Sequence, residues 1–361
     1  MTERSCNKVM VMAGGTGGHV FPALAVAHVL RARDIAVCWL GTRRGIEAEL
    51  VTANRFPIRY IEVAGLRGKG WRKLIGAPWK LLRALCQAIN VLRSERPDAV
   101  LGFGGFASGP GGLAAKLLGI PLIIHEQNAV AGTTNRLLAK VANRVLSAFP
   151  AALPDALWTG NPVRSEIAEL GAPQQRIAPA DRPRHLLVLG GSLGALAINQ
   201  ILPVALALLP EAQRPVVRHQ CGRDHVDATV AAYEQQGVNA GVEPFIGNMA
   251  DAYGWADLVV CRAGALTVSE LASAGIGAIL IPYPHAIDDH QTGNGQWLVA
   301  EGAADMIQQQ DLTAEKLASL LADWLADAAQ LQQRAVNARK LARPDVAETI
   351  AEICEEVCRG R

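Results

Sequence analysis

The sequence is poor in aromatic side chains and carries almost no excess of charge of either sign. Only 5% of its 361 residues are Phe, Trp or Tyr, and 35 basic residues stand against 33 acidic ones. A nucleic-acid-binding protein usually has a basic excess or a basic stripe. The charge balance therefore argues against nucleic acid as a partner, while an apolar content of 50% is enough for two hydrophobic cores.

Paired cysteines and a membrane-spanning run are also missing. The seven cysteines are scattered without a Cys-x-x-Cys pair, so we expect reduced thiols, as in a cytosolic protein, and no metal site. The first apolar run, residues 9–13, is too short for the core of a signal peptide. The long uncharged run 186–210 contains Asn199 and Pro203, which favours a buried strand and a helix over a membrane span.

Short apolar runs alternate with helical patterns in both halves of the chain, which predicts βαβ units and parallel sheets. In the first half the predicted strands are 8–12, 36–40, 59–63, 98–101, 121–124 and 144–146. In the second half they are 185–189, 216–220, 242–245, 257–260, 278–281 and 304–307. Each half opens with a strand, a glycine-rich turn and a helix, so we expect an α/β protein of two Rossmann-like, doubly wound domains.

The first glycine-rich turn spans residues 14–18 and leads into His19. Glycine lets a backbone approach phosphate closely, and the following helix directs free N–H groups at it. A tight turn without a ligand is the alternative. The spacing is not the G-x-G-x-x-G of a dinucleotide site, and no ribose-binding acid ends the second strand. His19 is either a general base near neutral pH or a histidine that only fixes the loop.

Further small or polar residues follow predicted strands at 102–112, 125–128 and 262–270. In α/β folds, ligands bind at these carboxyl ends of strands. Glu126 could support a base or orient a loop. Glu270 lies about one turn into a predicted helix, where it could accept hydrogen bonds from a ribose diol or serve only as a helix-end charge. The polar loop 282–291 is a candidate sugar-binding loop.

The stretch 71–85 mixes Trp, Leu and Ile with Lys and Arg. This composition is typical of a segment that docks at a membrane interface. An ordinary amphipathic helix with its apolar side on the core is the alternative. No Asp-x-Asp pair ends a predicted strand, so we predict no catalytic metal and no cofactor. A leaving diphosphate would then need a cation such as Arg164 together with helix N-termini.

Taken in order along the chain, these motifs resemble the MurG family of peptidoglycan N-acetylglucosaminyltransferases, which make lipid II from lipid I. The resemblance covers nearly the whole length. It rests on residues 14–19, 104–105 with 108–110, 125–128, 160–164, 190–192 and 264–270.

The resemblance implies a glycosyltransferase B fold with a cleft between two domains. It implies an N-terminal acceptor and membrane-associated domain over residues 1–163 and a C-terminal UDP-sugar-binding domain over residues 164–342. The final helix, within 343–361, is expected to pack back on the first domain.

The resemblance also implies the site residues. The family's candidate base is His19, with Glu126 as a second polar candidate. The UDP-N-acetylglucosamine contacts would be Thr16, Gly17, Gly18, Asn128, Arg164, Ser192, Ile246, Ala265, Leu266, Thr267, Val268, Ser269, Glu270 and Gln291. The acceptor diphosphate would meet Gly15, Gly104, Gly105 and Ser108, and the membrane patch would be Ile75, Trp79, Leu82 and Leu85.

The implied activity is that of an inverting, metal-independent hexosyltransferase. It would move N-acetylglucosamine from UDP to the 4-hydroxyl of the N-acetylmuramyl unit of lipid I. Such an enzyme would act as a peripheral protein on the cytoplasmic face of the inner membrane, with anionic lipid and other cell-wall synthesis and division proteins as partners. A UDP-sugar 2-epimerase and a non-catalytic binding module are the alternatives.

Overall fold

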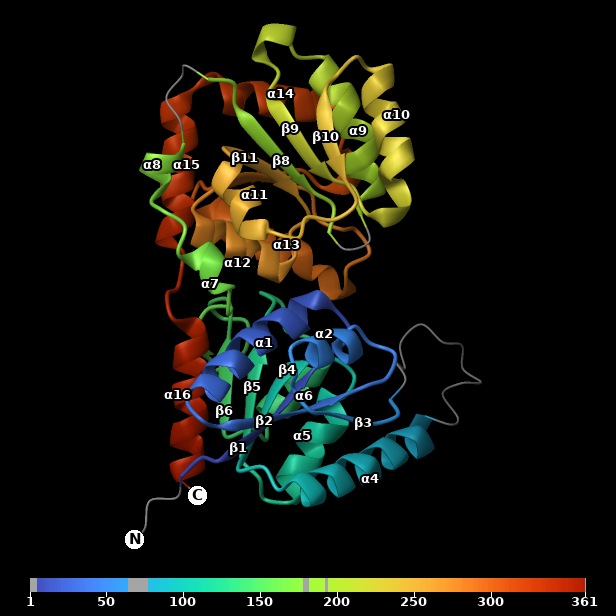
Figure 1. The fold of residues 1–361 in the computed structure, drawn as a ribbon, viewed down its shortest axis with the longest axis vertical. Helices are drawn as coiled ribbons and strands as arrows, with labels where there is room; N and C mark the ends of the chain where they lie inside the picture. The colour runs from blue at the N-terminus through green and yellow to red at the C-terminus, as the bar shows by residue number, and fades with distance from the viewer. Residues whose placement is uncertain (1–4, 64–76, 178–181, 192–193, 361) are drawn as a thin grey trace. The chain divides into compact units, whose positions relative to one another are not determined.

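The computed structural model describes residues 5–63, 77–177, 182–191 and 194–360. The chain divides into two compact units (Figure 1). Unit 1 comprises Met1–Val163 and Asp345–Arg361, and unit 2 comprises Arg164–Pro344.

Unit 1 is built on a seven-stranded parallel sheet with the order β3-β2-β1-β4-β5-β6-β7. Its strands are β1 (Lys8–Ala13), β2 (Ala36–Gly41), β3 (Ile58–Tyr60), β4 (Ala99–Gly104), β5 (Leu122–Glu126), β6 (Arg144–Ser147) and β7 (Leu157–Trp158). Its helices include α1 (Gly17–Ala32), α2 (Glu47–Ala53), α4 (Ala77–Glu95), α5 (Ser108–Leu117), α6 (Thr133–Ala139) and α16 (Val346–Arg359). The strand order reverses between β1 and β4, so the turns that follow these two strands lie at a topological switch point.

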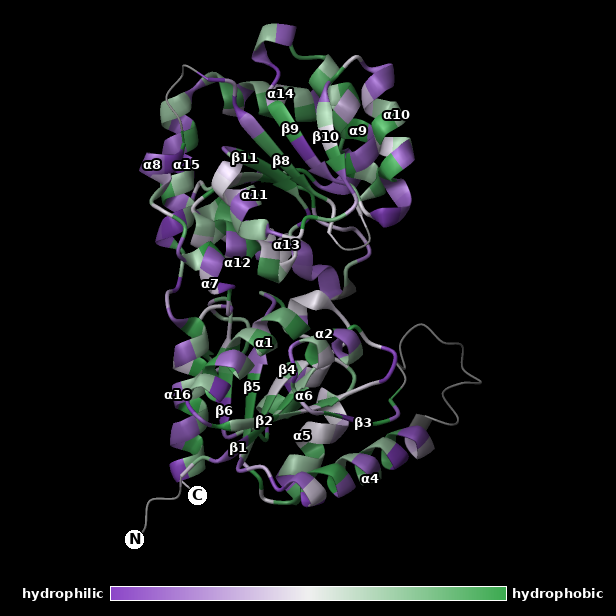
Figure 2. Cartoon of the chain, viewed as in Figure 1, coloured by the Kyte–Doolittle hydropathy of each residue, from purple (hydrophilic) through white to green (hydrophobic). Residues whose placement is uncertain are grey.

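Alternate residues of β1 enter two different cores, one on each face of the sheet. Val9 and Val11 pack in the core that α1 and α16 cover. Met10 and Met12 pack in the core that α4 and α5 cover. A strand buried on both faces is apolar at successive positions, which is why β1 appears in the sequence as a continuous apolar run and as a green strand in Figure 2.

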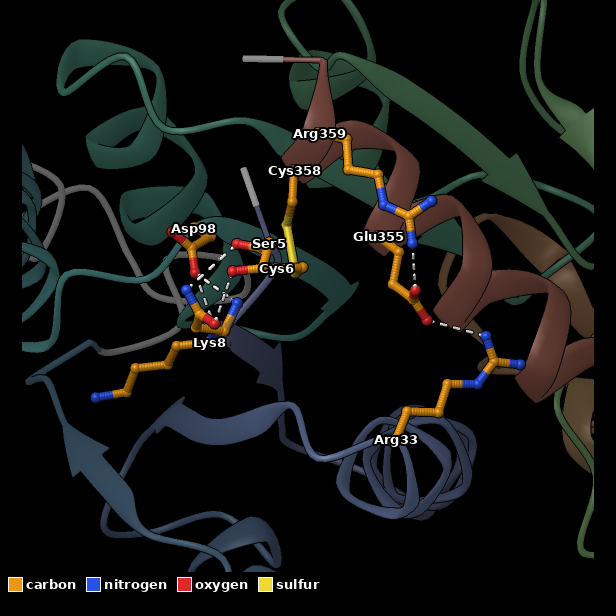
Figure 3. The surroundings of a disulfide bond; sticks show 9 residues. Ser5, Cys6, Lys8, Arg33, Asp98, Glu355, Cys358 and Arg359 are labelled. Atoms are coloured by element: carbon orange, nitrogen blue, oxygen red, sulfur yellow. Dashed lines mark hydrogen bonds and ion pairs between the residues drawn. A yellow bond between two sulfur atoms is a disulfide. The ribbon is translucent and has the colours of Figure 1, made fainter. Parts of the chain in front are cut away.

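Helix α16 joins the two ends of the chain within unit 1. Its apolar residues Ile350, Ala351 and Cys354 belong to the core beside β1 and α1. Cys358 is bonded to Cys6 in a disulfide with Cα atoms 5.3 Å apart, and Arg33 forms an ion pair with Glu355 at 3.0 Å (Figure 3). The expectation of seven reduced thiols is therefore wrong for this pair. The two cysteines are 352 residues apart in sequence, and only the return of α16 brings them together.

Unit 2 repeats the architecture with a six-stranded parallel sheet of order β10-β9-β8-β11-β12-β13. Its strands are β8 (His185–Leu189), β9 (Val216–Gln220), β10 (Ala240–Glu243), β11 (Leu258–Cys261), β12 (Gly277–Leu280) and β13 (Ala304–Met306). Its helices are α7 (Ser165–Ala168), α8 (Pro173–Arg176), α9 (Leu196–Ala207), α10 (Val226–Gln235), α11 (Met249–Trp255), α12 (Ala265–Ala274), α13 (His290–Ala300), α14 (Ala314–Ala326) and α15 (Ala328–Lys340). The order reverses between β8 and β11.

The predicted fold class, two doubly wound α/β domains with parallel sheets, is confirmed. The uncharged run 186–210 forms β8 and α9, as predicted. Several strand predictions were displaced, among them β3, which ends at Tyr60, and β10, which spans Ala240–Glu243 while Phe245 is exposed. Strand β7 was missed because two residues carry no pattern. Among the described helices, none is long and apolar enough to cross a membrane.

Candidate functional site

The two glycine-rich turns of unit 1 pack against each other at the switch point. Gly15, with φ +88°, follows β1, and Gly105, with φ +89°, follows β4. A Cβ atom on Gly105 would lie 2.4 Å from the carbonyl oxygen of Gly14. A side chain at position 105 would therefore separate the turns, which explains glycine there.

Glu47, at the start of α2, braces the first turn from behind. Its side chain is buried, with a relative exposure of 1%. One carboxylate oxygen accepts a hydrogen bond from the Gly15 N–H at 3.0 Å, and the other accepts from the N–H and hydroxyl of Thr42 at 2.9 and 2.7 Å. Cβ atoms on Gly14, Gly41 or Gly45 would lie within 3 Å of the Glu47 side chain. These glycines therefore make room for a buried carboxylate.

His19 lies in the first turn of α1 and contacts residues from two other strand ends. Its Nδ1 is 2.7 Å from Oε1 of Gln127. The side-chain nitrogen of Gln127 lies 3.0 Å from Nδ1 of His125. The Nε2 atom of His125 lies 2.8 Å from the Gly160 carbonyl oxygen. A Cβ atom on Gly104 would lie 3.2 Å from Cε1 of His19, so the backbone of the second glycine turn packs on the imidazole.

Glu126 is buried at the end of β5, and its carboxylate holds the loop that follows. It accepts hydrogen bonds from the N–H of Asn128 at 2.9 Å and of Gly132 at 3.2 Å, and from the side chain of Asn135 at 2.9 Å. Asn128 also donates from Nδ2 to Glu126 at 3.2 Å. Of the two roles predicted for Glu126, this geometry matches loop orientation.

The glycine turn of unit 2 is held by a neutral side chain. Gln220, at the end of β9, accepts a hydrogen bond from the Gly191 N–H at 3.0 Å and donates to the Gly191 carbonyl at 2.9 Å. Gly191 has φ +81° and Gly194 has φ +76°, and a Cβ atom on Gly194 would lie 2.1 Å from the Cys221 carbonyl oxygen. Ser192, a predicted diphosphate contact, lies outside the described residues.

Helix α12 follows β11, the strand that pairs with β8, and Glu270 lies in the second helical turn of α12. Gly264 is its N-cap residue, and no side chain caps the helix there. Glu270 is buried and forms an ion pair with Arg164 at 2.7 Å, while the Tyr253 hydroxyl donates to its other oxygen at 3.1 Å. Burial raises the pKa of Glu270, against the lowering effect of Arg164 and of the Tyr253 hydrogen bond.

Several predicted donor contacts in unit 2 are buried. Ile246, Ala265, Val268 and Ser269 have little exposed surface, and the Ser269 hydroxyl donates to the Ala265 carbonyl. These residues therefore expose little surface to a ligand in unit 2. Gln291, at the start of α13, accepts a hydrogen bond from the Tyr283 N–H at 2.9 Å and so pins the polar loop 282–291.

The predicted membrane patch is partly exposed on α4. The Trp79 side chain is 77% exposed, and Leu82 is exposed as well. Leu85 packs partly against the core, and Ile75 lies outside the described residues. Leu113 and Leu117 of α5 and Leu137 of α6 are also exposed. Unit 1 therefore exposes further apolar side chains outside the predicted patch.

The structure groups the predicted site residues within each unit. Unit 1 brings together Gly15, Thr16, Gly17, Gly18, His19, Gly104, Gly105, Ser108, Glu126 and Asn128 around the ends of β1, β4 and β5. Ser108 is fully buried and donates to the Gly104 carbonyl at 2.7 Å, so its hydroxyl supports the turn. Among the described residues, no group of three or more His, Cys, Asp or Glu is placed to hold a metal ion.

Four residues that hold these groups in place received no individual role from the sequence: Glu47, Gln127, Gln220 and Tyr253. Gln127 lies in the polar run 125–128, which was singled out as a whole because it follows a strand, and Gln220 ends β9, where the same signal was available. Glu47 and Tyr253 lie on helices and carry no such signal.

Comparison with known proteins agrees with this architecture. The N-terminal domain of glycosyltransferase family 28 matches residues 9–147, and its C-terminal domain matches residues 185–350. The chain is 54% identical to the UDP-N-acetylglucosamine–N-acetylmuramyl-(pentapeptide) pyrophosphoryl-undecaprenol N-acetylglucosamine transferase of Marinobacter nauticus, with 100% of both chains covered. It is 57% identical to the protein of that name from Cellvibrio japonicus, covering 98% of this chain and 99% of that one.

Among solved structures, the chain is similar to the crystal structure of Acinetobacter baumannii MurG. The TM-score is 0.85 and the sequence identity 44%, with 97% of this chain and 99% of that chain covered. This likeness confirms the predicted glycosyltransferase B fold. The chain belongs to glycosyltransferase family 28 and, within it, to the family of these N-acetylglucosamine transferases.

Proposed function

We propose that the protein transfers N-acetylglucosamine from UDP-N-acetylglucosamine to the 4-hydroxyl of N-acetylmuramyl-(pentapeptide)-pyrophosphoryl-undecaprenol, which converts lipid I to lipid II in peptidoglycan synthesis. The observation that carries this proposal is the 54% identity to a transferase of that name over the full length of both chains. The site geometry supports it, because each unit presents a glycine turn at a switch point of its sheet.

Unit 2 would hold the UDP part of the donor. Glu270 is the proposed ribose ligand, since a buried carboxylate retains acceptor capacity beyond its bonds to Arg164 and Tyr253. The first N–H groups of α12 would meet the diphosphate, because a helix N-terminus without a capping side chain favours anions. Ser192, Arg164 and Gln291 would complete the phosphate and sugar contacts, and the backbone of Ile246 would meet the uracil.

Unit 1 would supply the base. In the proposed step, His19 takes the proton of the acceptor hydroxyl while that oxygen attacks C1 of the donor sugar. The new C1–O bond forms as the bond from C1 to the phosphate oxygen breaks, and the electron pair leaves with UDP. Attack opposite UDP inverts the anomeric configuration. A positioned base contributes about 10²–10⁴-fold. Arg164 and the start of α12 would stabilise the negative charge on UDP.

The acceptor diphosphate would lie at the second glycine turn, beside Gly104 and Gly105. The Gly15 N–H is already bonded to Glu47, and the Ser108 hydroxyl to the Gly104 carbonyl. We therefore assign these two residues a supporting role in that subsite. Thr16, Gly17 and Gly18 would face the donor sugar and the acceptor, with Asn128 beside them.

The exposed apolar side chains of α4, α5 and α6 would dock unit 1 on the membrane that contains the lipid-linked acceptor. Trp79 and Leu82 stand beside Lys80 and Arg83, which are exposed as well. Apolar anchors with adjacent cations suit an anionic lipid surface. We propose a peripheral location at the cytoplasmic face of the inner membrane, where other proteins of wall synthesis, cell shape and division are available as partners.

The proposal is tested with radiolabelled UDP-N-acetylglucosamine, a short-chain lipid I analogue, and chelator. Acceptor-dependent transfer of label into the lipid product is expected. Conversion of the donor to an epimer without transfer would indicate a 2-epimerase instead. Donor binding with neither free UDP nor product would indicate a binding module.

A further inference from the structure

We infer that Gln127 is a positioning residue that fixes the His19 imidazole in the tautomer protonated at Nδ1, which leaves the Nε2 lone pair for the proton of the acceptor hydroxyl. The inference rests on the proposed role of His19 as the base. It concerns one chain of hydrogen bonds within unit 1, from Gly160 through His125 and Gln127 to His19.

The orientation of the Gln127 amide follows from a backbone carbonyl. One end of the amide lies 2.8 Å from the carbonyl oxygen of His125. A carbonyl oxygen only accepts hydrogen bonds, so the nitrogen of the amide must be at this end. The oxygen Oε1 is then at the other end, 2.7 Å from Nδ1 of His19.

The second proton of the Gln127 amide meets His125. The Nε2 atom of His125 is 2.8 Å from the carbonyl oxygen of Gly160, so this nitrogen must carry the proton. Its Nδ1 is then an acceptor, 3.0 Å from the Gln127 nitrogen. Burial lowers the pKa of His125 to about 4, which keeps this ring neutral. Every donor of the Gln127 amide therefore has an acceptor.

His19 is the last residue in this chain of hydrogen bonds, and its tautomer follows from them. Because Oε1 of Gln127 can only accept, Nδ1 of His19 must donate, and in the neutral ring Nε2 then carries the lone pair. Gln127 is buried, and Gly104 packs on the imidazole, which limits rotation of both partners. The arrangement has the order nucleophile, base, orienting group that activates hydroxyls in other enzymes. Here the neutral amide of Gln127 orients the imidazole and adds no charge to the site.

The tautomer is measured directly by long-range ¹H–¹⁵N correlation spectra of the full-length protein labelled with [¹⁵N]histidine, recorded at about pH 8. The signals that are absent from the spectrum of His19→Gln identify the ring nitrogens of His19. We expect a protonated Nδ1 and an unprotonated Nε2 in the wild type. Gln127→Met removes the acceptor, and the ring should then move toward the Nε2–H form. A wild-type His19 protonated at Nε2 would overturn the inference whether or not the variant folds.

Kinetics give an independent readout. Gln127→Met should lower kcat by about ten- to a hundredfold, within the range of a general base, with the donor KM within about twofold of wild type. The matched control is Gln87→Met, which removes a hydrogen bond to the Glu62 N–H in the same unit but away from His19. An equal loss in both variants, or an unchanged tautomer in Gln127→Met, would contradict the inference.

The positioning role of Gln127 and the proposed transferase activity are tested separately. If the wild type transfers no sugar but shows the Nδ1–H tautomer that Gln127→Met abolishes, the proposed function is wrong and the positioning role stands. If transfer occurs and Gln127→Met leaves both tautomer and kcat unchanged, the positioning role is wrong and the proposed function stands.

Discussion

The two units carry the same strand, glycine turn and helix, but different side chains brace the turns. In unit 1 the carboxylate of Glu47 accepts the Gly15 N–H, and in unit 2 the amide of Gln220 bonds both the N–H and the carbonyl of Gly191. Both braces are buried and both bond a glycine with positive φ. The turns therefore share a positive-φ glycine that is held by a buried side chain, and they differ in the charge of that side chain.

This difference separates the two motifs chemically. A buried carboxylate behind a turn repels an anion in front of it, because charges in the protein interior are poorly screened. A neutral amide imposes no such repulsion. The turn of unit 2 is thus better suited to the donor diphosphate, while the first turn of unit 1 is better suited to the neutral hydroxyl and imidazole of the proposed proton transfer.

The largest effects should come from alanine at the glycines whose Cβ would collide with backbone. Gly105→Ala and Gly194→Ala place a Cβ at 2.4 and 2.1 Å from carbonyl oxygens, so each should lower the free energy of unfolding by more than about 3 kcal/mol. Gly15→Ala and Gly191→Ala meet nothing within 4 Å and should cost only about 1–3 kcal/mol for the backbone conformation. Urea unfolding measures the four values. If Gly105→Ala lost no more stability than Gly15→Ala, and Gly194→Ala no more than Gly191→Ala, the turns would not be tightly packed.

Both units also bury a histidine, and acid should destabilise both. Burial lowers the pKa of His125 to about 4 and of His219 to about 3. The unfolded chain binds a proton at each near the ordinary value of about 6.5, which the folded chain does not. The free energy of unfolding should therefore fall as pH drops from about 6.5 toward 4, by on the order of 3 kcal/mol per histidine. In His219→Gln the free energy of unfolding should fall less steeply between these pH values. A fall as steep as in the wild type would show that burial of His219 does not cause the acid sensitivity.

Changing the charge of each brace tests the comparison directly. Gln220→Glu places a carboxylate behind the turn of unit 2, where it also faces the carbonyls of Gly191 and Pro244. We expect the Kd for UDP-N-acetylglucosamine to rise about tenfold, equivalent to ~1.4 kcal/mol. Glu47→Gln should leave that Kd within about twofold while it destabilises unit 1. Calorimetric titration measures both, and a larger loss of affinity in Glu47→Gln would reverse the assignment of the turns.

A smaller effect is expected at Tyr253, whose hydroxyl orients Glu270 at 3.1 Å. Tyr253→Phe removes one hydrogen bond to a carboxylate, so the donor KM should rise roughly fivefold, about 1 kcal/mol. The control is Tyr233→Phe, which removes a bond to the buried His219 in the same unit. With a 2′-deoxyribose donor the difference between Tyr253→Phe and wild type should shrink. An undiminished difference would mean that Glu270 does not bind the ribose.

Most of the fold was predictable because buried parallel strands are continuous apolar runs between helices. His185–Leu189 and Val216–Gln220 were predicted with their observed bounds. Strand β10 was displaced because Phe245, apolar but exposed, extended its apparent run. Strand β7 has only two residues and depends on its pairing with β6.

The site was predictable only where its residues lie in local motifs. The glycine turns and His19 follow strands directly, so the sequence alone places them. The contacts that orient them are long-range: Gln127 is 108 residues from His19, and Glu47 is 32 residues from Gly15. No periodicity or spacing encodes such contacts, and the disulfide between Cys6 and Cys358 was missed for the same reason.

The assignment of the donor diphosphate to unit 2 is tested most directly by hydrogen exchange of the full-length protein with and without UDP. UDP has the nucleoside and the diphosphate of the donor but not its N-acetylglucosamine, so only the subsite for UDP should respond. We expect slower exchange in peptides covering residues 190–195 and 264–270, and no change in peptides covering residues 13–19. Protection of residues 13–19 with no change in the two peptides of unit 2 would contradict this assignment.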